Sequence, residues 1–272
     1  MSIDVLSLWD FSNPELSEQR FRCELESASS DVRLILMTQI ARTYGLRKRF
    51  DEARGVLAAI EPEIEDATDE VRLRYRLELG RSYCSPAHDE SLLTDDARTR
   101  AKQCYDEAFH IGERARLDYL AVDALHMMAM VFPDPAEQLE WDLKTLAYME
   151  GSDQIQAKKW EPSLRNNVGY ALHQAGRYEE ALKQFELALE LRVSAGSVQG
   201  IRTGYWMIAW TLRSMARYQE ALDIQLRMEK EWDADEKPSP YVYEELEHLY
   251  RAIGDEKLAA HNAALRKALS PH

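Results

Sequence analysis

The residue types that carry most enzyme chemistry are present in this sequence, but their spacing matches no catalytic or metal-binding motif. Seven histidines occur, and no two of them are three or four residues apart, so no single helix presents a two-histidine metal face. Cys23, Cys84 and Cys104 form no CxxC pair. Glycine-rich phosphate loops and the serine- and zinc-hydrolase signatures are also missing. We therefore expect no metal, no cofactor and no catalysis, and keep an enzyme as the minor alternative.

Charge and length exclude further classes of protein. The chain has 272 residues, a net charge of −14 and a pI near 5.0. Binding to nucleic acid or to an anionic membrane requires basic surface, so neither is expected. The longest nearly apolar run, residues 124–132, is too short to cross a bilayer. The odd number of cysteines and the absence of a signal-type N-terminus favour a reducing cytoplasm.

Helical periodicity runs through nearly the whole sequence. Apolar residues recur at steps of three and four in residues 178–191, and alternating strand patterns are absent. Asn13 and Pro14 are typical of the cap and first residue of an additional N-terminal helix. The remaining helices are expected in pairs, at 30–47 and 49–63, 68–84 and 94–114, 117–131 and 135–149, 157–174 and 178–193, 198–215 and 218–232, and 239–252 and 255–269.

Domain boundaries have two candidate positions, the acidic or proline-bearing connectors at 61–70 and 233–240. The same helical pattern resumes after each connector, so we interpret both as turns between helix pairs. The predicted organisation is an N-terminal capping segment at residues 1–29, followed by one helical domain at residues 30–270.

An internal repeat organises this helical pattern. Residues 163–191 align with residues 203–231 at a constant offset of 40. The matched segments are Val168-Gly169 with Ile208-Ala209, Ala175-Gly176-Arg177-Tyr178 with Met215-Ala216-Arg217-Tyr218, and Glu180-Ala181-Leu182 with Glu220-Ala221-Leu222. One supersecondary unit is therefore repeated along the chain.

The repeated unit resembles the tetratricopeptide repeat. Residues 163–191 supply the small, glycine, aromatic and alanine residues of that template, namely Gly169, Gly176, Tyr178, Ala181, Phe185 and Ala188. The resemblance implies an all-α, right-handed superhelical solenoid of about six helix pairs. A period near 40 indicates the long-helix variety, as in kinesin-light-chain-type proteins and peptide-sensing bacterial regulators. Small residues such as Gly169 and Ala181 should let the two helices of a pair approach closely, with Phe185 filling the space.

The resemblance also implies a concave groove lined by the first helix of each pair. The template positions that face this groove supply arginines for carboxylates, asparagine amides for a peptide backbone and aromatic rings as anchors. These candidate ligand-binding residues are Arg42, Arg81, Asn166, Asn167, Tyr170, Trp206, Trp210 and Arg213. Two alternatives stay open: one tryptophan can belong to the core, and the arginines can be paired with nearby glutamates.

These residues predict a protein–protein interaction module or scaffold whose partner is a protein or peptide, acidic or carboxylate-ended. Opposite potentials on the groove and the back would steer such a partner. The alternative is a cytoplasmic sensor of a small signalling peptide. Thr38 and Arg42 stand where chaperone-binding repeats carry Lys and Asn, so a chaperone C-terminus is not implied. Residues 85–97 contain an insertion of nine residues relative to the repeat at 163–191, and we predict that this insertion is a surface loop.

Overall fold

The computed structural model describes residues 3–235 and 237–269, and over these residues the protein is all-α, with no strand. The helices group in two compact units, one ending at Trp160 and one beginning at Glu161. The first unit contains α1 (Val5–Leu8), α2 (Pro14–Leu25), α3 (Ser30–Leu46), α4 (Phe50–Ile64), α5 (Asp69–Tyr83), η1 (Glu90–Leu92), α6 (Asp95–Ala115), α7 (Asp118–Ala129), α8 (Pro135–Gly151) and α9 (Ile155–Lys158). The second contains α10 (Glu161–Gln174), α11 (Tyr178–Ser194), α12 (Val198–Ser214), α13 (Tyr218–Ala234), α14 (Pro240–Ala252) and α15 (Glu256–Leu269).

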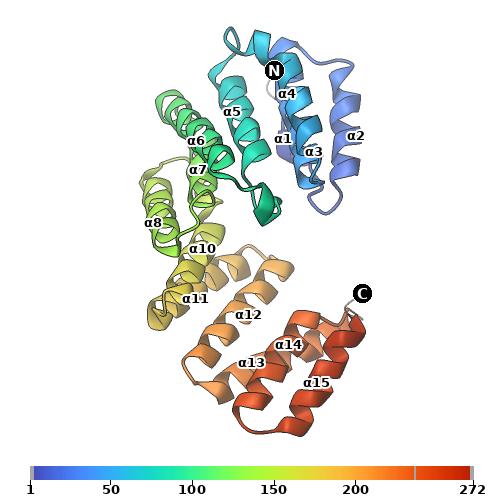
Figure 1. Cartoon of the computed structure of the whole chain (residues 1–272), viewed down its shortest axis with the longest axis vertical. Coiled ribbons are helices and arrows are strands. Elements are labelled where there is room, and N and C mark those ends of the chain that lie inside the picture. The colour runs from blue at the N-terminus through green and yellow to red at the C-terminus, as the bar shows by residue number, and fades with distance from the viewer. Residues whose placement is uncertain (1–2, 236, 270–272) are drawn as a thin grey trace. The chain divides into compact units, whose positions relative to one another are not determined.

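Consecutive helices pack as pairs, which confirms the helix-pair architecture expected from the repeat (Figure 1). The pairs are α3/α4, α5/α6 and α7/α8 in the first unit, and α10/α11, α12/α13 and α14/α15 in the second. Helix α2 packs against α3, and its cap is the predicted one, because Asn13 accepts a hydrogen bond from the Leu16 amide and Pro14 follows it. The assignment of residues 1–29 to a cap and of 30–270 to one domain stays a prediction.

One expected helix is divided in two. The sequence pattern predicts a single helix over residues 157–174, whereas α9 ends at Lys158 and α10 begins at Glu161. Pro162 explains the break, because it lacks the N–H that a continuous helix would donate to the Lys158 carbonyl. Trp160 lies in the interruption and donates its indole N–H to the Tyr119 carbonyl oxygen at 3.1 Å.

Small residues set the distance between the two helices of a pair, as the repeat template implies. A Cβ added to Gly169 would lie 2.7 Å from Cε1 of Phe185, and one added to Gly80 would lie 2.6 Å from Cε1 of Tyr105. Both rings are fully buried. Only glycine leaves room for a ring at these two contacts, so the same device holds α5 to α6 and α10 to α11.

The turn inside several pairs uses a left-handed backbone. The residue two before the second helix has a φ of +72° at Gly176, +57° at Ala216 and +61° at Lys48. Glycine adopts this conformation freely, whereas alanine and lysine are strained in it. The repeat alignment of Gly176 with Ala216 therefore corresponds to a shared backbone shape.

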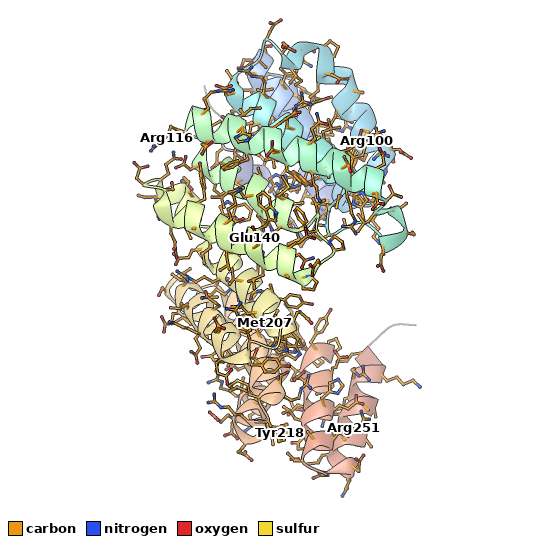
Figure 2. The ribbon with its side chains drawn as sticks, turned by 60° about the vertical axis from the view of Figure 1, so that its left-hand side comes forward. Arg100, Arg116, Glu140, Met207, Tyr218 and Arg251 are labelled. Atoms are coloured by element: carbon orange, nitrogen blue, oxygen red, sulfur yellow. The ribbon has the colours of Figure 1, made fainter. Side chains whose placement is uncertain are left out.

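The first helices of neighbouring pairs contact one another: α3 with α5, α5 with α7, and α12 with α14. The second helices expose charged side chains to solvent, as Figure 2 shows for Arg100 on α6 and Glu140 on α8. The surface that gathers side chains from successive pairs is thus the one formed by the first helices.

Candidate functional site

In the first unit, Arg42 and Arg81 come together, but with carboxylates between them. Arg81, on α5, is ion-paired through one nitrogen with Glu78 at 2.5 Å and through the other with Asp123 of α7. Arg42, on α3, lies 4.0 Å from Glu78 Oε1. Glu78 and Asp123 are both buried. The helix-to-helix contacts of α3, α5 and α7 therefore bring two cations and two anions into one cluster, which we call the charge cluster.

The two arginines of the charge cluster differ in how well they are compensated. Burial alone would lower the pKa of Arg81, but the Asp123 and Glu78 carboxylates outweigh it and raise that pKa above its usual range. Burial and then the neighbouring Arg81 lower the pKa of Arg42. Asp123 keeps a lowered pKa despite its burial, because Arg81 and Arg42 favour its charged form. The positive charge of Arg42 is thus less fully compensated by carboxylates than that of Arg81.

The N-terminal segment covers part of this surface. The Trp9 and Phe11 rings stack with centroids 4.7 Å apart, and the Arg42 guanidinium lies 5.5 Å from each ring centroid. Trp9 donates its indole N–H to Gln39 at 3.0 Å. Thr38, which the template places on the groove, is fully buried and donates to the Ile35 carbonyl oxygen. The groove position at Thr38 is therefore closed to a ligand.

A pocket of about 220 Å³ opens beside the charge cluster. Arg42, Glu78 and Arg81 line it, and residues 85–87 of the inserted segment form part of its wall. This segment is anchored, because His88 stacks on Phe50 with ring centroids 3.6 Å apart. It has a surface location, as predicted, and it also shapes a pocket. The segment also forms the Lys48–Asp89 ion pair at 2.6 Å, and just before it the Cys84 carbonyl oxygen accepts a hydrogen bond from the Tyr105 hydroxyl at 2.6 Å.

In the second unit, Tyr170 of α10 and Trp206 and Trp210 of α12 form a stacked row that we call the aromatic shelf. The Trp210 ring centroid lies 5.7 Å from that of Tyr170 and 5.8 Å from that of Trp206. Tyr170 is 45% exposed and both tryptophans are half-buried, so neither tryptophan is enclosed in the core. Trp206 donates its indole N–H to the Tyr241 carbonyl oxygen at 3.1 Å.

His173 supports the aromatic shelf from beneath. Its ring stacks on Trp210 with centroids 3.3 Å apart, and its Nδ1 lies 3.0 Å from the Thr211 hydroxyl. Burial, together with the nearby Arg213, lowers the pKa of His173 to about 4. A neutral imidazole at ordinary pH can stack on the indole without a buried charge. This histidine is therefore a structural support of the shelf.

The polar candidates of the second unit are held by neighbouring side chains. Arg213 forms an ion pair with the buried Glu245 of α14. Asn166 accepts a hydrogen bond from Arg192 at 3.2 Å, and Asn167 is half-buried on the same helix. Arginines 42, 81 and 213 thus all have a carboxylate partner, which is the alternative that the sequence left open.

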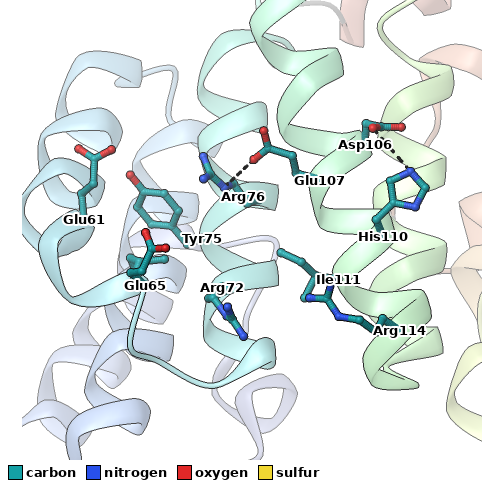
Figure 3. A pocket seen from close by; sticks show the side chains of 11 residues that line it. Glu61, Glu65, Arg72, Tyr75, Arg76, Asp106, Glu107, His110, Ile111 and Arg114 are labelled. Carbon is teal, nitrogen blue, oxygen red and sulfur yellow. Dashed lines mark ion pairs between the residues drawn. The ribbon is translucent and has the colours of Figure 1, made fainter.

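A second pocket, of about 430 Å³, lies among α4, α5 and α6 of the first unit. Figure 3 shows Glu61 of α4 and Glu65, which follows α4, on the same side of the pocket, with Tyr75 of α5 between Glu61 and Arg76. Arg76 pairs with Glu107 at 2.9 Å, and His110 lies 3.7 Å from Asp106. Charges of both signs are mixed along its walls, so this pocket favours no single ligand charge.

Glu78 and Asp123 were not among the predicted site residues, although spacing carried a signal for both. Glu78 lies one helical turn before Arg81, and Asp123 lies 42 residues after it, close to one repeat period. Trp9 and Phe11 had no comparable signal, because they lie outside the repeats. No group of metal ligands occurs within residues 3–235 and 237–269, and no helix there is both long and apolar enough for a membrane span.

Known proteins share the helix-pair fold. Residues 160–227 match the family model of the tetratricopeptide repeat. The protein is built from tetratricopeptide-type helix pairs. No curated protein matches the sequence.

Solved structures share the fold at low sequence identity. A putative kinesin light chain of Podosopora anserina with nearly identical repeats is 15% identical, with a TM-score of 0.56, over 77% of this chain and 99% of that one. RapI without ligand is 12% identical, with a TM-score of 0.69, over 97% and 74%. A Rap protein complexed with competence and sporulation factor is 15% identical, with a TM-score of 0.58, over 98% and 77%. The expected long-helix tetratricopeptide fold is confirmed.

Proposed function

We propose that this protein is a non-enzymatic, cytoplasmic interaction module that binds a protein or peptide segment on the first-helix surface of its second unit. The observation that carries the proposal is the aromatic shelf, where Tyr170, Trp206 and Trp210 form one stacked, partly exposed row across two repeats. Rigid aromatic side chains give a large contact area for little conformational entropy, which is why they dominate binding hot spots. The bound segment should insert one or two apolar side chains.

An acidic or carboxylate-ended partner remains part of the proposal, with a limited role for charge. A carboxylate that displaced Glu78 or Asp123 from Arg81 would leave a buried anion unpaired, at a cost of about 3–5 kcal/mol. Arg42 also has Glu78 as a neighbour, with the nearest carboxylate oxygen 4.0 Å away, so a further carboxylate gains little there. Binding energy should therefore come mainly from the aromatic shelf, with a modest salt-dependent contribution from exposed charge.

The alternative is a sensor of a small signalling peptide. Its support is the likeness in fold to the Rap protein complexed with competence and sporulation factor. Both possibilities use the same surface and differ in partner length, so one experiment addresses them together.

A displayed library of random twelve-residue and five-residue peptides should be selected on the full chain. The affinity of selected peptides is then measured for the wild type, Tyr170→Ala and Trp206→Ala. Each truncation should weaken binding about tenfold or more, the effect of losing roughly 1.4 kcal/mol of contact energy. The matched control is Tyr205→Ala, because Tyr205 neighbours Trp206 but its ring lies under Arg227 of α13.

If the selected peptides bind both shelf variants as tightly as the wild type, the binding surface lies elsewhere and the proposal is wrong. Enrichment of five-residue peptides over twelve-residue ones would favour the sensor. Unchanged circular dichroism melting curves show that a loss of binding is not a loss of folding.

A further inference from the structure

The pocket beside the charge cluster has apolar residues both deep inside it and at its surface. Ala41, Ala53 and Met127, which we call the floor, line the pocket and are each at most 5% exposed. Leu46, which is 42% exposed, and Pro86, which is also exposed, line it as well, and we call them the rim. A ligand that enters this pocket therefore meets apolar surface from the rim to the floor.

The charged groups that line the pocket are balanced within the protein. Arg81 is paired with Glu78 and with Asp123, and Arg42 lies 4.0 Å from Glu78 Oε1. Glu78 Oε2 is enclosed by protein atoms, so a ligand cannot reach it. Two cations thus face two anions. A charged ligand group would lose its hydration and find no unbalanced charge to pair with.

The serines that line the pocket also have partners within the protein. The Ser82 hydroxyl donates a hydrogen bond to the Leu79 carbonyl oxygen at 2.7 Å. The Ser85 hydroxyl lies 3.0 Å from His88 Nδ1. A polar ligand group would have to break these contacts or give up hydrogen bonds to water without replacing them. Charge balance and internal hydrogen bonding therefore both favour an apolar ligand group.

The size of the pocket suits a single side chain. Its volume is about 220 Å³, and a cavity of about 150 Å³ is already large enough for benzene. Residues 85–87 form part of the wall, and the stack of His88 on Phe50 anchors this segment. The wall is therefore formed before a ligand arrives, which lowers the entropic cost of binding.

We propose that this pocket binds one uncharged aliphatic side chain, such as Leu or Met, of a protein partner. The side chain enters past Leu46 and Pro86 and contacts Met127 at the floor. Removal of its methyl groups from water supplies the binding energy. The pocket lies in the first unit and depends on the insertion, so it is a site separate from the aromatic shelf of the second unit.

The N-acetyl amides of leucine, asparagine and aspartate are matched probes, because their side chains have nearly the same shape and differ in polarity and charge. Each is titrated into the full chain, whose methionine methyl groups carry ¹³C for NMR. The leucine probe should shift the Met127 methyl signal with a dissociation constant on the order of 1 mM, typical of so few atoms. It should not shift that of Met207, which lies in the second unit. The other two probes should bind at least tenfold more weakly.

Two variants locate the site, each with a matched control. Gly45→Leu should fill the pocket and weaken binding of the leucine probe at least tenfold, because Gly45 lines the pocket and an added Cβ meets no atom within 4 Å. Its control is Gly55→Leu, where the Cβ is equally unhindered but lies outside the lining. Leu46→Ser removes part of the rim and should weaken binding about fivefold. Its control is Leu92→Ser, because Leu92 is 49% exposed and does not line the pocket.

The proposal is overturned if the asparagine or aspartate probe binds as tightly as the leucine probe, or if the leucine probe leaves the Met127 signal unchanged. It is also overturned if Gly45→Leu and Leu46→Ser both bind the leucine probe like the wild type. Trp206→Ala should leave binding of this probe unchanged, so failure of the pocket is distinguished from failure of the aromatic shelf. Circular dichroism melts of every variant establish that the chain is folded in each titration.

Discussion

Gly80→Ala should destabilise the first unit, although alanine is the better helix former. The added methyl would lie 2.6 Å from Cε1 and 2.9 Å from Cδ1 of Tyr105, a ring that is fully buried and cannot move freely. Overpacking of this kind costs about 1–3 kcal/mol. Gly→Ala inside a helix otherwise gains up to about 1 kcal/mol. The net change should be a loss of up to about 2 kcal/mol in the free energy of unfolding.

Gly55→Ala is the matched control in the same unit, because an added Cβ there meets no atom within 4 Å. It should raise the free energy of unfolding by up to about 1 kcal/mol. Urea denaturation followed by circular dichroism measures both variants. The double variant Gly80→Ala/Tyr105→Leu should recover part of the loss, because leucine lacks the Cε1 atom. Equal stabilisation by the two alanines would refute the close-approach account of the helix pairs.

Four further changes test other parts of the structure. Ala216→Gly should raise the free energy of unfolding by about 1 kcal/mol, because it relieves a left-handed alanine. The pKa of His173 is lowered to about 4, so the unfolded chain binds this proton at higher pH than the folded chain does. Lowering the pH from 7 to 5 should therefore reduce the free energy of unfolding by about 2 kcal/mol. Denaturation curves of His173→Gln should show a smaller reduction over the same pH range. Burial raises the pKa of Asp142 to about 7, so the folded chain holds this proton at higher pH than the unfolded chain does. The free energy of unfolding should therefore fall as the pH rises through 7. Asp142→Asn should remove about 2–3 kcal/mol of this fall between pH 5 and pH 8. Shortening residues 85–97 to a normal turn should preserve helicity in circular dichroism but lower the melting temperature, because the His88 stack is lost.

Periodicity in the sequence was sufficient to predict the pairs because helix pairing depends on local spacing. Gly169 and Phe185 lie sixteen residues apart within one repeat, and their contact repeats a fixed geometry. The template therefore transfers directly to three-dimensional packing. The break before α10 was missed because Pro162 lies near a helix start, where the pattern allows proline within a longer helix as well as in the first turn.

The site was harder to predict, because its chemistry depends on contacts between repeats. The template indicates that Arg81 belongs to a first helix, but the carboxylates that neutralise it come from its own helix and from α7. Side-chain pairing of this kind requires both the register of each helix and the distance between helices. Asp142 shows the same limit, since nothing in its sequence surroundings distinguishes a buried carboxylate from the many exposed ones.

Equivalent positions of one repeat template have acquired different chemistry in the two units. Near Arg42 and Arg81 the first-helix surface is polar and charge-balanced, so a charged ligand gains little there. At Tyr170 and Trp206 it is aromatic and partly exposed, so a ligand gains by removing apolar surface from water. The first kind of contact is short-ranged and selects a functional group, whereas the second tolerates many side chains and supplies affinity. A partner of this protein should therefore bind mainly through the second unit.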